Sequence, residues 1–308
     1  MSGGLVAMLA VELEGVTKSF GSFVAVNDVS LRIPVNSIYG FIGPNGSGKT
    51  TTLRMIMRIY FPDRGHIRVL GEESWQAAND RVAYLPEERG LYKQMTVRDI
   101  LRFYAELKGC RNCDAAMKDW LERMGLMDWA DKKVEALSKG MAQKVQFIAT
   151  VISNPELVLL DEPFSGLDPV NAEVLRDAVL DLKKRGATVI FSTHDMAVAE
   201  RMCDRIFMIY RGKKVLDGTL DGIQSVYGND TVAVRMDEGA SLEGLPGVEK
   251  VTDFGNHQEV RLRPGSDPQA VLASLMQRGR VRRFEETRPS LHDIFVRIAS
   301  PAPEDRRA

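Results

Sequence analysis

A glycine-rich loop followed by lysine and threonine constrains this chain more than any other part of its sequence. Residues 43–50 read Gly-Pro-Asn-Gly-Ser-Gly-Lys-Thr and fit the pattern G-x-x-x-x-G-K-[ST] of a phosphate loop. The preceding residues 37–42 are mostly apolar, as a buried parallel strand should be, and a helix is predicted from Thr51 onward. The apolar positions that share one face of this helix are Leu53, Ile56, Met57 and Tyr60. We therefore predict an α/β fold in which this loop grips a nucleoside triphosphate.

Each residue type in the loop has a physical reason to be there. Glycines let the backbone wrap so that successive N–H groups and the following helix N-terminus point at phosphate oxygens. Lys49 supplies a positive charge, and Thr50 supplies a hydroxyl for magnesium. The residues expected to bind the nucleotide here are Gly43, Pro44, Asn45, Gly46, Ser47, Gly48, Lys49, Thr50 and Thr51.

Residues 157–162 combine a run of aliphatic residues with two adjacent carboxylates at its end. The run predicts a central strand, and ligands of open α/β sheets bind at the carboxyl ends of the strands. Because neighbouring side chains of a strand point in opposite directions, Asp161 and Glu162 cannot do the same job. One can hold magnesium while the other faces the γ-phosphate and its attacking water. Hydrolysis, rather than simple binding, is the predicted chemistry.

Three further motifs resemble the nucleotide-binding subunits of ATP-binding-cassette (ABC) transporters, over roughly residues 10–220. Residues 137–141, Leu-Ser-Lys-Gly-Met, are similar to the family's signature loop and precede a predicted helix at 142–152. Residues 165–168, Ser-Gly-Leu-Asp, are similar to the loop that crosses the dimer interface. Residues 192–194, Ser-Thr-His, follow an apolar strand and end in a histidine similar to the γ-phosphate switch residue. The resemblance implies a P-loop NTPase core of the ABC type with a helical subdomain.

The resemblance also implies a site shared by two protomers that close head to tail over two Mg-ATP. Ser138 and Gly140 of one chain would bind the γ-phosphate held by the phosphate loop of the other. Glu162 would polarise the attacking water, and His194 would support the γ-phosphate. The magnesium ligands implied are Thr50, Asp161 and Glu87.

An aromatic residue upstream of the loop bears on the choice of base. Phe20 matches the residue on which the adenine ring stacks in the family, and Phe23 is a nearby competitor. Because stacking on a π face discriminates poorly between bases, the preference for adenine over guanine rests on the resemblance.

Two motifs depart from the family pattern. Glu87 stands where most members have glutamine, and it adds a third carboxylate beside the γ-phosphate. Lys139 and Met141 replace the glycine and glutamine usual in the signature loop. In combination with the neighbouring residues, these departures resemble the ATPase subunits of two-gene bacterial exporters, including the sodium-extrusion type. Members of that branch carry a small extra domain after the cassette.

Length and composition are those of a large globular protein. The 308 residues are 44% hydrophobic, enough for one full α/β domain and a smaller companion. Lys and Arg number 41 and Asp and Glu 42, so a net charge of −1 gives no field that would attract nucleic acid. No apolar run approaches the ~18 residues that span a bilayer. Residues 1–11 lack the basic start and cleavage site of a signal peptide, so we expect a cytoplasmic protein at the inner face of the membrane.

The resemblance implies an ATPase subunit that powers a separate integral membrane permease in the direction of export, as a dimer with a second copy of this chain or with a related chain. The alternative is a soluble ABC ATPase that acts in translation or DNA repair. Such proteins generally carry two cassettes or a long coiled-coil insert, whereas this chain has one phosphate loop and no extended heptads. A nucleotide sensor without turnover is a third possibility.

The chain is expected to divide into an ABC ATPase domain over residues 1–220 and a small α+β domain over 228–300, followed by a flexible tail at 301–308. A helical subdomain is expected at about 91–155. The helical stripe expected to form its core is Val97, Ile100, Leu101, Tyr104 and Leu107.

The second domain is expected to serve dimer contact or regulation. Residues 231–236 and 259–263 alternate apolar and polar, as strands do, and residues 267–277 predict an amphipathic helix. A basic cluster could bind an anionic partner or form a solvated edge. Its members are Arg278, Arg280, Arg282 and Arg283.

The three cysteines do not form a disulfide framework typical of secreted proteins. Cys110 and Cys113 form a C-x-x-C motif, which could be a redox pair or half of a zinc site. Because there is no second pair and no nearby histidine, we expect two reduced thiols. Cys203 is expected to be a packing residue.

Overall fold

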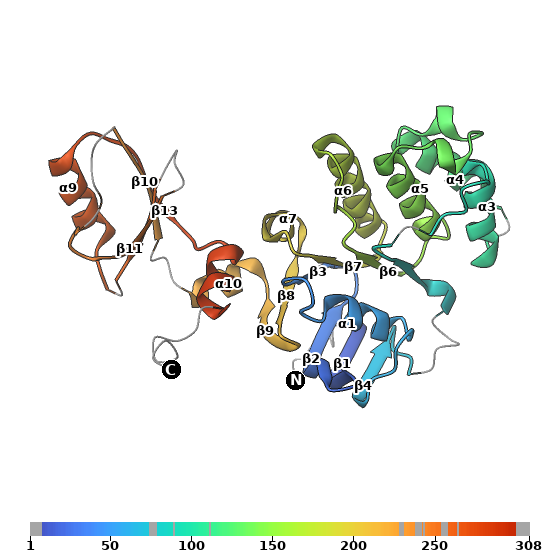
Figure 1. The fold of residues 1–308 in the computed structure, drawn as a ribbon, viewed down its shortest axis with the longest axis horizontal. Coiled ribbons are helices and arrows are strands. Elements are labelled where there is room, and N and C mark those ends of the chain that lie inside the picture. The colour runs from blue at the N-terminus through green and yellow to red at the C-terminus, as the bar shows by residue number, and fades with distance from the viewer. Residues whose placement is uncertain are drawn as a thin grey trace, which may run out of the picture. The chain divides into compact units, whose positions relative to one another are not determined.

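The computed structural model describes residues 8–73, 79–88, 90–110, 112–227, 231–237, 242, 244–253, 258–263 and 265–299. The chain separates into two compact units, one up to Gly218 and one from Thr219 (Figure 1). The first unit combines mixed sheets with helices, and the second is a small α+β fold, so the predicted fold class is confirmed.

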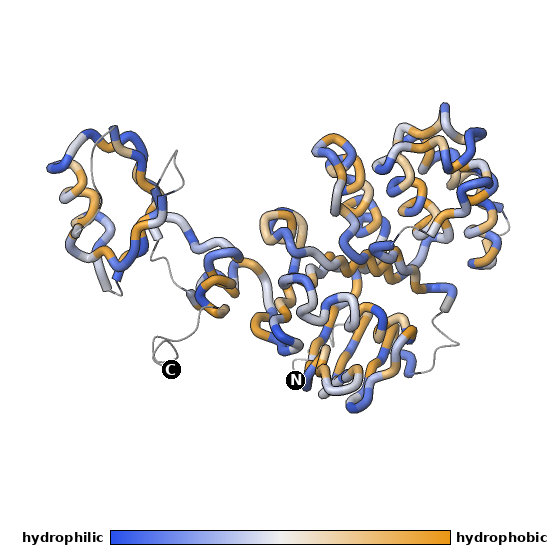
Figure 2. Tube along the Cα trace, viewed as in Figure 1, coloured by the Kyte–Doolittle hydropathy of each residue, from blue (hydrophilic) through white to orange (hydrophobic). Residues whose placement is uncertain are grey.

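A six-stranded sheet forms the centre of the first unit, in the order β5-β6-β7-β3-β8-β9. All neighbours are parallel except β8 and β9. Strands β3, β6 and β7 are buried at every position, which explains their continuous apolar runs (Figure 2). The strand bounds are β3 (Ile38–Ile42), β5 (Val82–Leu85), β6 (Leu157–Asp161), β7 (Thr188–Thr193), β8 (Arg205–Tyr210) and β9 (Lys213–Gly218).

A second, antiparallel sheet packs with helix α1 (Lys49–Ile56) against the central sheet, around one hydrophobic core. Its strands are β2 (Phe23–Pro34), β1 (Leu9–Phe20) and β4 (Arg64–Val69). The sequence predicted that the apolar face of α1 would extend to Tyr60, which was wrong. Arg58 adopts a left-handed conformation, with φ of 54°, so the helix ends at Ile56 and Tyr60 lies beyond it.

The other main core joins the central sheet to the helical subdomain and to the helices that follow β6 and β7. The predicted stripe on α3 is buried at Val97, Ile100 and Leu101 and half-buried at Tyr104. Leu107 is 63% exposed, so its prediction as a core residue was wrong: it ends the helix on the solvent side. None of the described helices is both long and apolar enough to cross a membrane. The helices are α3 (Val97–Leu107), α4 (Asp114–Arg123), α5 (Lys139–Val151), α6 (Pro169–Lys184) and α7 (Met196–Met202).

The prediction of two reduced thiols in the loop between α3 and α4 was also wrong. The chain reverses at Gly109, whose φ is 73°, and brings the Cα atoms of Cys110 and Cys113 to 6.0 Å. A disulfide joins the two residues. Cys203 does pack beside the core, where its Sγ lies against Gly40.

The second unit is built on an antiparallel sheet in the order β11-β12-β10-β13, with α9 packed on a small hydrophobic core. Two members of the predicted basic cluster are paired, Arg282 with Asp237 and Arg283 with Glu285. The predicted flexible tail lies outside the described residues. The elements are α8 (Leu220–Val226), β10 (Thr231–Met236), β11 (Val248–Asp253), β12 (Gln258–Leu262), α9 (Pro268–Arg278), β13 (Val281–Thr287) and α10 (Leu291–Ala299).

Candidate functional site

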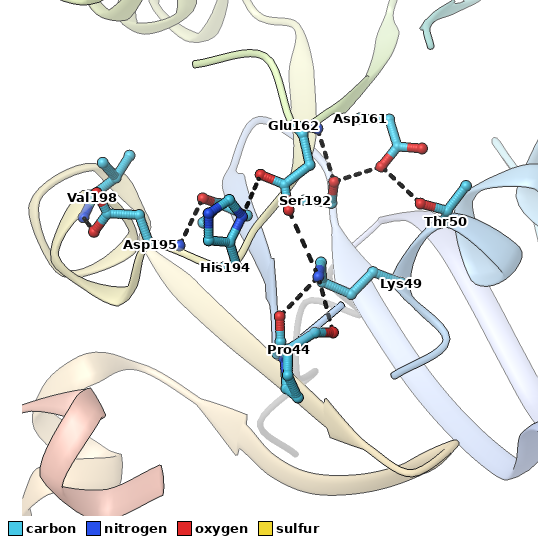
Figure 3. Close-up of polar contacts among 11 residues, drawn as sticks. Pro44, Lys49, Thr50, Asp161, Glu162, Ser192, His194, Asp195 and Val198 are labelled. Carbon is cyan, nitrogen blue, oxygen red and sulfur yellow. Dashed lines mark hydrogen bonds and ion pairs between the residues drawn. The ribbon is translucent and has the colours of Figure 1, made fainter. Parts of the chain in front are cut away.

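The glycine-rich loop connects β3 to α1 at the carboxyl edge of the central sheet. In the parallel ladder, Ile42 at the end of β3 pairs with Thr193 at the end of β7. On the other side of β7, Asp161 at the end of β6 pairs with Ser192. The register thus brings three strand ends, from distant parts of the chain, to one place (Figure 3).

Two glycines of the loop occupy positions that other residues could not. Gly43 has a φ of 150°, and a Cβ there would lie 2.2 Å from the carbonyl oxygen of Ile209. Gly48 has a φ of 114°, and a Cβ there would lie 2.5 Å from the carbonyl oxygen of Ala25. Because L side chains rarely adopt these backbone conformations and the gaps are far below contact distance, the loop keeps its shape only with glycine at both positions.

Lys49 is buried against the loop that precedes it. Its Nζ donates hydrogen bonds to the carbonyl oxygens of Gly43 (2.7 Å) and Pro44 (3.2 Å), and it lies 3.6 Å from Glu162 Oε1 (Figure 3). Burial lowers the pKa of Lys49, and the negative charge of Glu162 acts in the opposite direction. The ammonium group is therefore held at the place where a phosphate loop receives phosphate oxygens.

Asp161 is fully buried, and three hydroxyl groups surround its carboxylate. Thr50 Oγ1 donates to Oδ1 at 3.1 Å, and Ser192 Oγ donates to the same oxygen at 2.6 Å. The Tyr84 hydroxyl donates to Oδ2 at 3.2 Å. Burial and the charge of Asp161 raise the pKa of Tyr84 to about 12, so this hydroxyl stays protonated at neutral pH. The structure brings Thr50 and Asp161, two of the predicted metal ligands, into direct contact.

Glu162 turns away from Asp161, toward Lys49 and His194 (Figure 3). Its Oε2 lies 3.0 Å from Nδ1 of His194, and because a carboxylate only accepts, the imidazole is the donor. Glu162 is buried, whereas about half of the His194 side chain (55%) is exposed. The two residues predicted to be catalytic are therefore in contact, and His194 faces the open side.

Two buried polar atoms beside the loop, Ser47 Oγ and Glu162 Oε1, accept or donate no hydrogen bond among the described residues. Buried polar atoms are nearly always paired, so the unpaired oxygen of Glu162 fits a site completed by a polar ligand. Glu162 lines a hollow of about 370 Å³ next to the loop. The other residues that line this hollow are Phe23, Ala25, Asn45, Gly46, Gly48, Lys49, Thr50, Thr51 and Glu87.

The donor set also fits magnesium held together with a nucleotide. The described residues contain no group of three or more His, Cys, Asp or Glu side chains that could hold a metal alone. Magnesium usually takes one or two carboxylates and completes its shell with substrate phosphates and water. Thr50 and Asp161 beside the phosphate loop match that requirement, and Glu87 reaches the same hollow.

Of the two aromatic candidates, the structure brings Phe23 rather than Phe20 to the hollow. Phe23 is 60% exposed, so its ring is free to receive a partner. The Phe20 ring packs edge-on against Tyr60, with ring centres 5.2 Å apart, and Lys18 Nζ lies 5.6 Å from its centre. From the sequence, Phe20 was the first candidate for stacking on the base. Its contact with Tyr60 could not be predicted from the motif.

Ser138 and Gly140 do not line this hollow. Ser138 begins α5, where its hydroxyl accepts a hydrogen bond from the N–H of Met141 at 3.3 Å. Lys139 lies over the loop at 165–168, since a Cβ on Gly166 would lie 2.8 Å from its Nζ. The signature-like loop and the interface-like loop are thus neighbours within one chain, apart from the phosphate loop.

Sequence reasoning missed Ser192 and Tyr84 as parts of the site. Both residues lie in motifs that the sequence singles out, Ser192 two residues before His194 and Tyr84 three residues before Glu87. Nothing in either motif indicates that the two hydroxyls meet the carboxylate of Asp161, because that contact depends on strand register.

Comparison with known proteins decides the family. Residues 26–165 match the family profile described as ABC transporter. The chain is 40% identical over 287 residues to the ABC transporter ATP-binding protein YhaQ of Bacillus subtilis (strain 168). The aligned region covers 92% of this chain and 96% of that protein. The chain belongs to the ABC transporter ATP-binding proteins. Its activity is ATP hydrolysis coupled to transport, and the predicted family is confirmed.

Other comparisons agree with this family. The chain is 32% identical over 306 residues to the Nod factor export ATP-binding protein I of Burkholderia lata, covering 96% of this chain and 98% of that protein. The solved ATP-binding subunit of an ABC transporter is similar in fold, with a TM-score of 0.67 and 30% identity over 71% of this chain and 93% of that one. Residues 218–299 match the C-terminal domain of DrrA1-3-like ATP-binding proteins, so this ABC protein has the extra domain that its length suggested.

Proposed function

We propose that this ABC protein hydrolyses Mg-ATP as one half of a dimer and thereby drives export through a separate integral membrane permease. The observation that carries this proposal is the incompleteness of the site in one chain. Lys49 and Glu162 line the hollow and His194 contacts Glu162, whereas Ser138 and Gly140 lie outside it. A second copy that supplies these two residues would complete the site.

Five residues of the site each take one role in this proposal. Thr50 and Asp161 hold magnesium, which when bound neutralises charge on the β- and γ-phosphates. Lys49 binds the same phosphates, and Glu162 accepts a hydrogen bond from the attacking water and orients it. His194, which already contacts Glu162, supports the γ-phosphate from the open side.

The relatives support the proposed direction of transport. Nod factor export ATP-binding proteins match along most of this chain, which supports export, although their cargo is not carried over. We place the protein at the cytoplasmic face of the cell membrane, bound to its permease. The relatives are transporter subunits, and this favours transport over the alternative of a soluble ABC ATPase.

Replacing the two aromatic residues tests where the base stacks. Phe23→Ala should weaken ATP binding about tenfold, or ~1.4 kcal/mol, because it removes an exposed ring beside the hollow. Phe20→Ala is the matched control and should bind ATP like the wild type. Titration with a fluorescent ATP analogue measures both. The opposite ranking would return the stacking role to Phe20.

Glu162→Gln tests the role of the buried carboxylate. The amide keeps the size of the side chain but accepts water's hydrogen bond less strongly, so phosphate release should fall at least about 100-fold. ATP affinity should stay within about threefold of the wild type. Steady-state phosphate release and equilibrium binding give the two readouts. Turnover that persists in Glu162→Gln would remove this residue from the chemistry.

Mixing two inactive variants tests the shared site. Lys49→Ala disables the phosphate loop and Ser138→Arg blocks the signature loop, and each should be inactive alone. In a mixed dimer, one site combines the intact Lys49 of one chain with the intact Ser138 of the other. Because about half of the dimers are mixed and half of their sites are intact, activity should recover to about one quarter of the wild-type rate. No recovery, with mixed dimers verified by differential tags, would contradict the head-to-tail dimer.

Purification from membranes tests the permease. The tagged chain, expressed in its own organism and extracted with a mild detergent, should bring down an integral membrane protein that raises its ATPase rate. Recovery of ribosomes or DNA with no membrane protein would favour the soluble alternative. A Lys49→Ala chain prepared in parallel controls for stimulation by contaminating ATPases.

A further inference from the structure

A single serine connects the two carboxylates on which the proposed chemistry depends. Ser192 lies in β7 directly opposite Asp161 of β6, and it is completely buried. Its hydroxyl donates to Asp161 Oδ1 at 2.6 Å and accepts a hydrogen bond from the backbone N–H of Glu162 at 2.9 Å (Figure 3). One hydroxyl group therefore contacts the side chain of one residue and the main chain of the next.

The backbone at Glu162 explains why this second hydrogen bond matters. Glu162 has a φ of 48°, in the left-handed region that residues other than glycine rarely adopt. Such a conformation is strained and persists only where its surroundings hold it, and it clusters at functional sites. Strand β6 ends at Asp161, so the N–H of Glu162 has left the ladder, and Ser192 Oγ accepts it instead. The left-handed turn is what directs the Glu162 carboxylate toward Lys49 and His194.

The contact with Asp161 fixes the other carboxylate. Ser192 and Thr50 both donate to Oδ1, and Tyr84 donates to Oδ2. The contact from Ser192 is the shortest of the three, and Ser192 alone among these three residues also contacts Glu162. Loss of its hydroxyl would release Asp161 on one side and leave the N–H of Glu162 unpaired in a buried place.

We propose that Ser192 is a positioning residue that sets the arrangement of Asp161 and Glu162 together. It is completely buried and acts through the two carboxylates. This inference rests on the roles proposed above, in which Asp161 serves magnesium and Glu162 the attacking water.

The test compares three substitutions at this position in the full chain. Ser192→Ala and Ser192→Cys remove the strong hydroxyl hydrogen bonds, and Ser192→Thr keeps a hydroxyl but adds a methyl group to a filled site. The Mg²⁺ concentration that gives half-maximal binding of a fluorescent ATP analogue should rise about tenfold in Ser192→Ala and Ser192→Cys. In the same two variants, kcat should fall about 10- to 100-fold. ATP affinity in EDTA should not change. Ser192→Thr should stay within about threefold of the wild type in each readout.

The ranking of the variants separates positioning from packing. A merely structural serine would make Ser192→Thr the worst variant, because overpacking is destabilising, and that ranking would overturn the inference. Thr188→Val is the matched control, since Thr188 is a buried hydroxyl residue at the other end of β7 whose Oγ1 accepts from the N–H of Asn36 at 2.9 Å. This variant should lose thermal stability but keep the wild-type Mg²⁺ dependence.

Asp161→Asn separates this inference from the proposed function. A changed Mg²⁺ dependence in Asp161→Asn but not in Ser192→Ala or Ser192→Cys would overturn the role of Ser192 and leave the metal role intact. An unchanged dependence in Asp161→Asn would overturn the metal role, and the positioning role with it.

Discussion

The register of three parallel strands is the constraint on which the site depends. Asp161 faces Ser192 across one ladder, and Thr193 faces Ile42 across the next. A shift of one residue in either ladder would turn the carboxylates or the phosphate loop away from their partners, because side chains alternate between the faces of a sheet. The strands are buried on both sides, so the two hydrophobic cores that fix the fold also fix the spacing of the functional groups.

Burial of charge is the second property of this arrangement. Lys49, Asp161 and Glu162 are each less than a tenth exposed, and burying a charge is costly unless it is paired. The lysine and the two carboxylates compensate one another only in part, since Glu162 Oε1 lies 3.6 Å from Lys49 and makes no hydrogen bond among the described residues. A bound nucleotide would supply further polar partners for these buried groups.

The sequence predicted the fold well where local pattern and burial agree. Strand β10 has the predicted bounds and β6 lies within the predicted run at 157–162, because a clean alternation and an uninterrupted apolar run are strong signals. It failed where the outcome depends on a single backbone angle or on a distant neighbour. The left-handed Arg58 ended α1 before Tyr60, and the turn at Gly109 allowed the disulfide between Cys110 and Cys113. In the site, the motifs identified Lys49, Asp161, Glu162 and His194. That Phe23 rather than Phe20 lines the hollow depends on how the fold places the two rings, which no motif contains.

The position of Lys49 has a consequence for how a nucleotide enters. Its ammonium group already has two carbonyl partners, at Gly43 and Pro44, so arrival of a phosphate is an exchange of partners and not a new attachment. The free energy gained from that exchange is the difference between the two sets of contacts, so it is smaller than the phosphate contacts alone would give. When the phosphates leave, the same two carbonyl oxygens can again accept hydrogen bonds from the ammonium group of Lys49. The loop therefore favours release of the nucleotide after hydrolysis.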